Sequence, residues 1–445
     1  MKTFGNKRST LYGKAVFALA SFLVVSSCGP SEMESRMKSA WDGWNDPTIL
    51  EEMGIGEMSK FSTKLDELPV SGSLDLAGIW SDDYWPTFQG GISHRWSYPG
   101  WKSQDKSAYN LLSRDEVVNA SKEVLNYLSP SEKYDVLQND YDFSLTKFER
   151  QRTGVLKTFR ERPEFEEDYD IPTWEGLCHG WAPATIEFAE PHPVSYKNAE
   201  GIEIKMYSSD IKALLTFMYH YQSPKSTILG KRCNEDPPEE MDALYYRVEN
   251  GEISIEEYKS QIKEEYDSGK IDFNKYIALL GEARSVESCQ DSNAGAFHIV
   301  LANQIGRMNQ GFVIDVTREA EVWNQGVVSY EFNEIARYEG EEISKYAAAG
   351  TAQEVEYKTV IYYISEVAPH KSPEDYEKAR AVTSAEFNYK VELDGDGQII
   401  GGSWLSYDRP DFLWKQDRPK FEGYFEKLGK IYDLSISDYR NLRLN

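Results

Sequence analysis

The sequence predicts an α+β fold, with helices in its first half and antiparallel strands in its second. Residues 113–162 and 208–221 carry apolar residues at helical spacing, and Ser113 with Glu116 gives the first segment a capping box. Beyond residue 310 the apolar segments are short, rich in β-branched and aromatic residues, and separated by turn residues. Helices followed by repeated antiparallel strands are typical of an α+β domain.

Several segments have strand character. The predicted strands lie at residues 202–207, 294–301, 311–317, 328–332, 355–367, 386–393 and 398–405. The last two flank the sequence Asp394-Gly-Asp-Gly, which is a strong turn signal, so we expect a hairpin there.

The same turn also has a calcium interpretation. Glu392, Asp394 and Asp396 fall where an EF-hand loop has oxygen ligands. However, Ser403 stands where that loop has its bidentate glutamate, and strands rather than helices flank the turn. The pattern therefore favours a structural hairpin.

The first 27 residues have the pattern of an export signal. Lys2, Lys7 and Arg8 precede an apolar run, residues 15–27, that is too short to be a permanent membrane-spanning helix. The run ends in V-S-S-C, which resembles a bacterial lipobox, so we expect cleavage before Cys28 and lipidation of its thiol. An ordinary secretory signal is the alternative. Gly29 rather than an aspartate follows this cysteine. By resemblance to the lipoproteins of Gram-negative bacteria, this implies sorting to the outer membrane.

The remaining chain divides by composition. Residues 28–75 are polar with scattered apolar residues and are expected to be a lipidated tether with short helices. Residues 76–445 are expected to be one folded domain, in which the acidic segment 234–281 is a helical insertion. The predicted protein is exported and held by lipid at the outer membrane, in the periplasm or on the cell surface, without spanning the membrane.

Charge and composition exclude one class of partner. The 445 residues carry a formal net charge of −25 and include 13% aromatic residues, too many for a disordered chain. Nucleic acid is excluded as a partner because phosphate binding needs clustered Lys and Arg. Such a charge favours the approach of cationic partners, although solubility alone also explains it.

The residues around Cys178 predict a nucleophile. The stretch W-E-G-L-C-H-G-W-A-P-A-T-I-E-F-A-E, residues 174–190, places Cys178 on a glycine-rich turn before a short helix expected from Ala182, with Pro183 in its first turn. A cysteine at a helix N-terminus lies beside the positive end of the helix dipole, which favours the thiolate. A small buried cysteine under a tight turn is the alternative.

Two later stretches supply partners for this thiol. C-Q-D-S-N-A-G-A-F-H-I-V-L-A-N-Q-I-G places His298 on the predicted strand 294–301, and G-F-V-I-D-V-T places Asp315 on the next. Cysteine, histidine and aspartate in this order are typical of papain-like thiol acyltransferases. We therefore expect a papain-like core in which Cys178 is the nucleophile, His298 the base and Asp315 the group that orients the base.

Three of these motifs also resemble a known family. G-L-C-H-G-W-A-P-A, D-S-N-A-G-A-F-H and F-V-I-D-V-T-R-E-A-E-V-W-N-Q resemble the transglutaminase elicitor proteins of oomycetes and their bacterial relatives, and the likeness extends over roughly residues 76–414. The resemblance implies a catalytic triad of Cys178, His298 and Asp315. It also implies that the transglutaminase activity depends on calcium, although the sequence locates no calcium site. Gly326 replaces a proline of the family's elicitor segment, which affects recognition by plants rather than chemistry.

By this resemblance the protein is a protein-glutamine γ-glutamyltransferase. Cys178 would attack the carboxamide of a protein glutamine, and a lysine or another primary amine would resolve the thioester as an isopeptide. Trp181 would shield the thioester or line the substrate groove, or would belong to the core. A papain-like protease or amidase, and a non-enzymatic lipoprotein that binds peptides, are the alternatives.

Two cysteines remain, Cys233 and Cys289. In an oxidising compartment a leftover pair indicates a disulfide, with two reduced buried cysteines as the alternative. A disulfide here would close a loop of about 55 residues and stabilise the fold by on the order of 4 kcal/mol.

Overall fold

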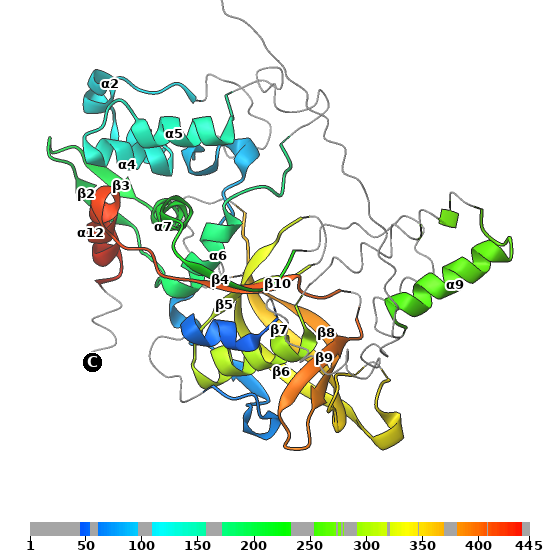
Figure 1. Ribbon diagram of the computed structural model, residues 1–445. Helices are drawn as coiled ribbons and strands as arrows, with labels where there is room; N and C mark the ends of the chain where they lie inside the picture. Colours follow the sequence, from blue (N-terminus) through cyan, green and yellow to red (C-terminus); the bar gives the residue numbers. More distant parts are fainter. Residues whose placement is uncertain are drawn as a thin grey trace, which may run out of the picture.

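The computed structural model describes residues 45–53, 61–96, 109–156, 171–232, 253–272, 275–276, 279, 292–317, 321–345, 347–368, 381–406 and 408–437. These residues form one large antiparallel sheet with helices on both faces (Figure 1). The predicted α+β class is therefore confirmed. No helix in the described ranges is long and apolar enough to cross a membrane.

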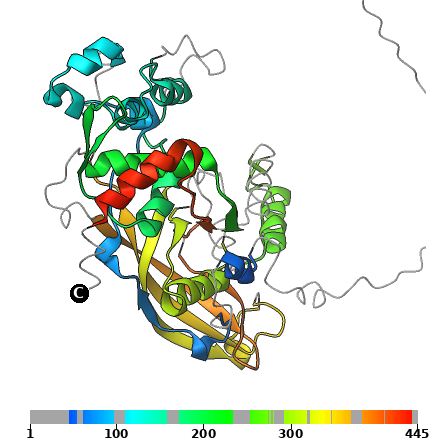
Figure 2. The ribbon, with the colours of Figure 1, turned by 90° about the vertical axis from the view of Figure 1, so that its left-hand side faces the viewer.

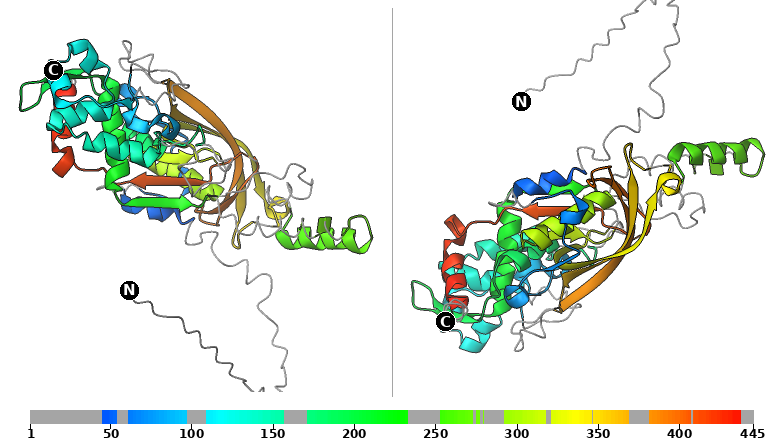
Figure 3. Two further views of the ribbon diagram at one scale, coloured as in Figure 1. Left: turned by 90° about the horizontal axis from the view of Figure 1, so that it is seen from above. Right: turned by 90° about the horizontal axis from the view of Figure 1, so that it is seen from below.

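The large sheet has eight strands, and every neighbouring pair is antiparallel. In sheet order they are β4 (Ser226–Gly230), β10 (Phe412–Gln416), β5 (Phe312–Asp315), β6 (Asn324–Glu339), β7 (Gln353–Ser365), β8 (Ala381–Leu393) and β9 (Ile399–Trp404), with β1 (Ser71–Ser73) paired to β6. A separate hairpin joins β2 (Val194–Lys197) to β3 (Glu203–Met206). The long strands β6, β7 and β8 form a curved ribbon (Figure 3).

The described helices fall mainly before the sheet in the chain. The α-helices are α2 (Arg114–Asn119), α3 (Lys122–Asn126), α4 (Pro130–Gln138), α5 (Ser144–Thr153), α6 (Cys178–Glu187), α7 (Ser208–Gln222), α9 (Ile255–Asp267), α11 (Ala294–Leu301) and α12 (Glu426–Ser435). A π-helical turn, η9 (Ala302–Arg307), continues α11. The short 3₁₀ turns are η1 (Pro47–Met53), η3 (Leu65–Glu67), η4 (Leu76–Gly78), η5 (Thr87–Gln89), η6 (Gly91–Ser93), η10 (Gly340–Glu342) and η11 (Gly423–Phe425).

Alternation along the strands creates one hydrophobic cluster on each face of the sheet. On β5, Val313 packs into a cluster with residues of α6 and α7, whereas Phe312 and Ile314 pack into a second cluster with α11. Side chains two residues apart on a strand share a face, so this division follows from the period of the strand. The sheet therefore separates α6 from α11.

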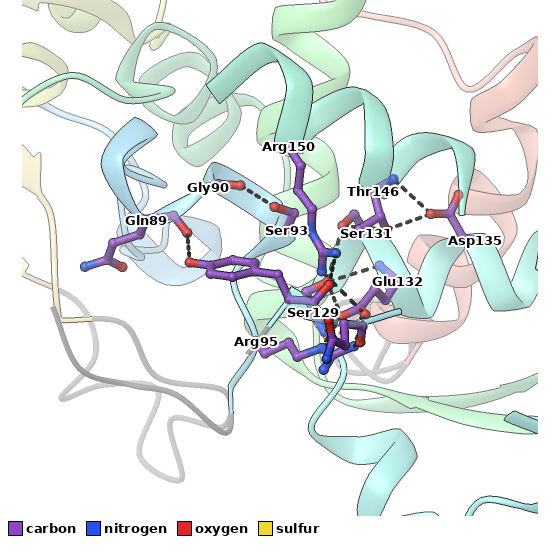
Figure 4. Close-up of polar contacts among 12 residues, drawn as sticks. Gln89, Gly90, Ser93, Arg95, Ser129, Ser131, Glu132, Asp135, Thr146 and Arg150 are labelled. Atoms are coloured by element: carbon purple, nitrogen blue, oxygen red, sulfur yellow. Dashed lines mark hydrogen bonds and ion pairs between the residues drawn. The ribbon is translucent and has the colours of Figure 1, made fainter. Parts of the chain in front are cut away.

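The helical half is tied together by polar groups as well as by the core. Glu132 on α4 accepts from Arg95 Nε at 2.9 and 3.1 Å, and from the Ser129 hydroxyl at 2.8 Å (Figure 4). Asp135 accepts from the backbone N–H of Thr146 at 2.9 Å, which caps the start of α5. The last helix, α12, packs beside α7 (Figure 2).

The prediction of a strand at 294–301 is wrong, because these residues form α11. The Asn293 side chain caps the helix by accepting from the N–H groups of Gly295 and Ala296 at 2.8 and 3.4 Å. All eight helix residues are buried, so the apolar run has no polar face that would reveal its period. A Cβ on Gly295 would meet Gly401 in β9, so the glycine lets the helix approach the sheet closely.

Other local predictions are confirmed. The capping boxes at Ser113 and Ser254 both form. The remaining predicted strands correspond to β3, β5, the middle of β6, β7, β8 and β9. The turn at Asp394 is a hairpin turn, in which Asp394 Oδ1 accepts from the N–H groups of Asp396 and Gln398, each at 2.9 Å.

Candidate active site

Cys178 is the first residue of α6, four residues earlier than the predicted start of that helix, and Pro183 lies inside the helix. The preceding turn is held by the segment at Tyr84, whose carbonyl accepts from the Leu177 N–H at 2.7 Å. A Cβ on Gly176 would lie 2.6 Å from the same carbonyl, so only glycine fits there. Close packing of two segments thus fixes the sulfur at the N-terminus of α6.

The sulfur contacts the start of β6. Cys178 is 8% exposed, and its Sγ lies 3.5 Å from Asn324 Nδ2 and 3.8 Å from the carbonyl oxygen of Val322. Asn324 is the first residue of β6 and is itself 5% exposed. On its other side, Asn324 Oδ1 accepts from Trp414 Nε1 at 2.8 Å.

Asp315 lies on the same face of the sheet as Asn324 and Trp414. It ends β5, pairs with Asn324 across the strands, and shares its face with Val313, which packs in the α6 cluster. Its Oδ1 accepts from the N–H of Trp323 at 3.0 Å, whereas its Oδ2 is buried with no hydrogen-bond partner among the described residues.

The Asp315 carboxyl has a strongly shifted pKa. Burial raises the pKa of Asp315 to about 7, although hydrogen bonds from the backbone at Trp323 and Thr317 and the charge of Arg232 oppose this rise. A carboxyl with this pKa can take up and release a proton at physiological pH.

Burial also raises the pKa of the Cys178 thiol, and hydrogen bonds from the side chain and backbone of Asn324 oppose that rise. The negative charges of Glu366 and Asp315 raise it further. Glu366 follows β7 and accepts from Gln325 Nε2 at 3.0 Å. The thiolate therefore depends on donors at its own position, namely the amide of Asn324 and the N-terminus of α6.

An aromatic pair borders the same site. The rings of Tyr84 and Trp323 meet edge to face with centroids 6.3 Å apart. Burial raises the pKa of Tyr84 to about 12, with further contributions from Asp83, Glu366 and the Cys178 thiol. These contributions indicate that the Tyr84 phenol, the Cys178 sulfur and the carboxylates of Asp83 and Glu366 lie in one region.

The structure does not bring His298 to this site. His298 lies on α11, and its ring stacks on Phe332 of β6 with centroids 3.7 Å apart, within the cluster on the other face of the sheet. Its Nδ1 is 2.9 Å from the hydroxyl of Tyr389. Burial lowers the pKa of His298 to about 3, so the ring is neutral at pH 7. Of the predicted triad, Cys178 and Asp315 lie on the α6 side of the sheet and interact electrostatically, whereas His298 packs in the second cluster.

The histidine after the nucleophile has a different partner. His179 Nε2 lies 2.9 Å from His220 Nδ1 on α7. Burial lowers the pKa of both rings to about 4; the charge of Arg152 adds to the effect on both, and that of His220 adds to the effect on His179. Two neutral rings can share one hydrogen bond, so this pair joins α6 to α7.

Trp181 belongs to the core. It is 0% exposed and packs in the α6 cluster, and its Nε1 has no acceptor among the described residues. The side chain therefore presents no surface to a substrate in this conformation, which favours the core role for Trp181 over the substrate-binding one.

The sequence analysis missed Asn324 and Trp414. Asn324 belongs to the V-W-N-Q end of a motif that resembles the family, and Trp414 ends the stretch of that likeness, but nothing in their spacing connects them. Only the pairing of β10 with β5, and of β5 with β6, brings them together.

Other predicted sites lie outside the described residues. This applies to Cys28 and to the Cys233–Cys289 disulfide. For calcium, the described part of the chain has no group of three or more His, Cys, Asp or Glu residues that could hold a metal ion. In the Asp394 hairpin, the Asp394 carboxylate accepts from N–H groups of its own turn through Oδ1.

The comparisons with known proteins agree with this fold. The chain is similar in structure to the GP42 transglutaminase from Phytophthora sojae, with a TM-score of 0.56 and 20% sequence identity over 88% of this chain and 99% of that one. No curated protein matches the sequence. The family described as "Transglutaminase elicitor" matches residues 55–254 and 281–433, leaving out a segment that contains α9. This match covers most of the chain, which therefore belongs to the transglutaminase elicitor family.

Proposed function

We propose that the protein is a transglutaminase that joins glutamine side chains to primary amines through a thioester on Cys178. The observation that carries this proposal is the pairing of a thiol at a helix N-terminus with a buried carboxyl whose pKa is about 7 and whose second oxygen has no partner among the described residues. Membership of the transglutaminase elicitor family supports the same reaction.

In the proposed reaction Asp315 itself serves as acid and base. Its Oδ2 accepts the thiol proton, and the sulfur attacks the carbon of the glutamine carboxamide. The first backbone N–H groups of α6 stabilise the resulting oxyanion. The proton then passes to the nitrogen of the leaving ammonia, which leaves a thioester on Cys178.

The second half of the reaction repeats these roles. An amine attacks the thioester carbon, Asp315 takes the amine proton, and the sulfur leaves as the isopeptide bond forms. Transfer to an amine rather than to water is favoured by the burial of Cys178, which is 8% exposed, and by the carboxylates of Asp315 and Glu366, which attract a cationic acceptor. His298 has no role here, because its contacts lie on the other face of the sheet.

Export and a lipid anchor at Cys28 complete the proposal. They rest on the charged and apolar pattern of residues 1–27 and on the V-S-S-C sequence. Mass spectrometry of the mature protein tests them, because a lipidated N-terminal cysteine at position 28 has a mass that neither an intact leader nor a simple cleavage product shares.

The test of the reaction is incorporation of a labelled primary amine into a glutamine-rich acceptor protein. We expect incorporation by the wild type, none by Cys178→Ala, and near wild-type incorporation by His298→Phe once folded protein is equalised. Ammonia release or peptide cleavage that depends on Cys178, without incorporation, would instead establish the amidase or protease. Neither activity, together with a slowly alkylated thiol, would support the peptide-binding lipoprotein.

A further inference from the structure

The amide of Asn324 has only one orientation compatible with its neighbours. The indole Nε1 of Trp414 is a donor and never an acceptor, and it lies 2.8 Å from Asn324 Oδ1. The opposite end of the amide, Nδ2, must then face Cys178 Sγ, 3.5 Å away. A flipped amide would place two donors together at Trp414 and an acceptor at the sulfur.

Burial makes this orientation costly to change. Asn324 is 5% exposed and Trp414 is 6% exposed, so water does not replace a lost partner easily. The two residues lie on strands that flank β5 on either side. Trp414 pairs with Val313, and Asn324 pairs with Asp315, so the indole reaches the amide across one strand on the α6 face.

We propose that Asn324 is a catalytic residue that donates a hydrogen bond from Nδ2 to the Cys178 thiolate, and that Trp414 is a positioning residue that holds this donor in place. The proposal rests on the proposed function only in taking Cys178 as the nucleophile. When the thiol proton moves to Oδ2 of Asp315, the sulfur gains a negative charge, and the N–H of Asn324 is the side-chain donor already directed at it.

The charges around the sulfur make this donor important. Asp315 from β5, Glu366 after β7 and the phenol of Tyr84 from the segment before η5 are the titratable groups that interact with the thiol, and the first two oppose its ionisation. A fixed N–H donor offsets part of that repulsion, because hydrogen bonds to charged groups are stronger than neutral ones.

The test measures the rate of Cys178 alkylation by iodoacetamide as a function of pH, which reports the thiolate fraction directly. We expect Trp414→Phe to raise the thiol pKa by about one unit and to slow alkylation at pH 7 roughly tenfold. Asn324→Leu should do the same. In the double variant, Trp414→Phe should add nothing to Asn324→Leu, because the indole acts through the amide.

Two controls separate this role from simple packing. Trp404→Phe removes an equally buried indole N–H, which donates to the Ser292 carbonyl at 2.6 Å in the other cluster, and it should leave the thiol pKa unchanged. Asn324→Asp keeps an acceptor for Trp414 but replaces the donor with a negative charge, so it should raise the thiol pKa more than Asn324→Leu does, even where Trp414→Phe folds poorly.

The outcomes are distinct. An unchanged thiol pKa in Asn324→Asp would overturn the proposal. Equal effects of Trp414→Phe and Trp404→Phe on the thiol pKa would do so too. So would a further shift of the thiol pKa when Trp414→Phe is added to Asn324→Leu. Amine incorporation is measured separately. A shifted thiol pKa in the variants of a protein that incorporates no amine would retain this inference and reject the transglutaminase. Normal amine incorporation, together with an unchanged thiol pKa in the variants, would support the transglutaminase and reject this inference.

Discussion

The two faces of the sheet bury titratable groups in opposite ways. On the α11 face, His298 has a hydrogen bond to Tyr389 and a stacked Phe332, and Tyr389 in turn accepts from the Thr359 hydroxyl at 2.8 Å. On the α6 face, Asp315 keeps one oxygen without a partner among the described residues, and it interacts electrostatically with a thiol whose ionisation is also opposed by burial.

This difference separates a structural polar group from a reactive one. A buried histidine with a satisfied ring and a pKa of about 3 exchanges no proton at pH 7. A buried carboxyl with a pKa of about 7 does. We therefore propose that the chemistry takes place on the α6 face, although histidine is the more usual general base.

The largest expected effect comes from Asp315→Asn. Loss of the acid and base should reduce amine incorporation by roughly 10²- to 10⁴-fold, because the amide of Asn keeps the shape but accepts no proton. Steady-state kinetics of incorporation measure the change. The matched control is Asp135→Asn, which removes another buried carboxyl, one that caps α5 and lies outside the site. A loss below threefold in Asp315→Asn would remove Asp315 from the mechanism.

The second prediction is a pair of opposite pH dependences of stability. For Asp315 the folded pKa, about 7, exceeds the unfolded value of 3.8, so the folded state holds the extra proton between these values and stability falls as pH rises through this window. For His298 the folded pKa, about 3, lies below 6.5, so stability falls as pH drops from 6.5 toward 3. Each contribution is at most about 5 kcal/mol, since one pKa unit corresponds to about 1.4 kcal/mol.

Urea unfolding between pH 3.5 and 7.5 resolves these two contributions. Asp315→Asn should reduce the loss of stability toward neutral pH, and His298→Phe should reduce the loss toward acid, to which His179 and His220 also contribute. If each variant keeps the slope of the wild type, the assignment of the two shifted groups to the two faces is wrong.

A smaller effect is expected from His298→Phe at neutral pH. The hydroxyl of buried Tyr389 loses its histidine partner, so the free energy of unfolding should fall by about 1–3 kcal/mol. Adding Tyr389→Phe should recover little of that loss, because the buried Thr359 hydroxyl then loses its acceptor. Activity per folded molecule should stay within about threefold of the wild type. A 10²-fold fall in activity with intact stability would restore His298 as a catalytic base.

Local sequence signals predicted much of the fold. The capping residues Ser113 and Ser254 marked helix starts correctly, because a cap is a local interaction within one turn. The α11 segment was misassigned because a fully buried run of eight residues has no periodic polar face. What distinguished it was the Asn293 cap, which was present in the sequence.

The candidate site was less accessible to sequence reasoning. Cys178 was predictable from its glycine-rich turn, and Asp315 from its unusual place in an apolar strand. The order of Cys, His and Asp suggested a triad, but order along the chain does not reveal which face of a sheet a residue occupies. Asn324 and Trp414 belong to strands separated by β5, so their contact depends on sheet order, which no local pattern encodes.

The smallest expected effect tests how closely α6 lies on the sheet. Gly326 in β6 faces α6, where an added Cβ would lie 3.0 Å from Ile186 Cγ2 and 3.2 Å from the Ala182 carbonyl. We expect Gly326→Ala to lower the free energy of unfolding by about 1 kcal/mol, because α6 must shift by a few tenths of an ångström. Such a shift would also move Cys178, at the start of the same helix, relative to Asn324.

Urea unfolding and the alkylation rate of Cys178 measure the two consequences of Gly326→Ala. Gly395→Ala is the control, since an added Cβ there meets nothing within 4 Å. Equal stability of the two variants, with equal alkylation rates, would show that the helix position tolerates more change than this packing implies.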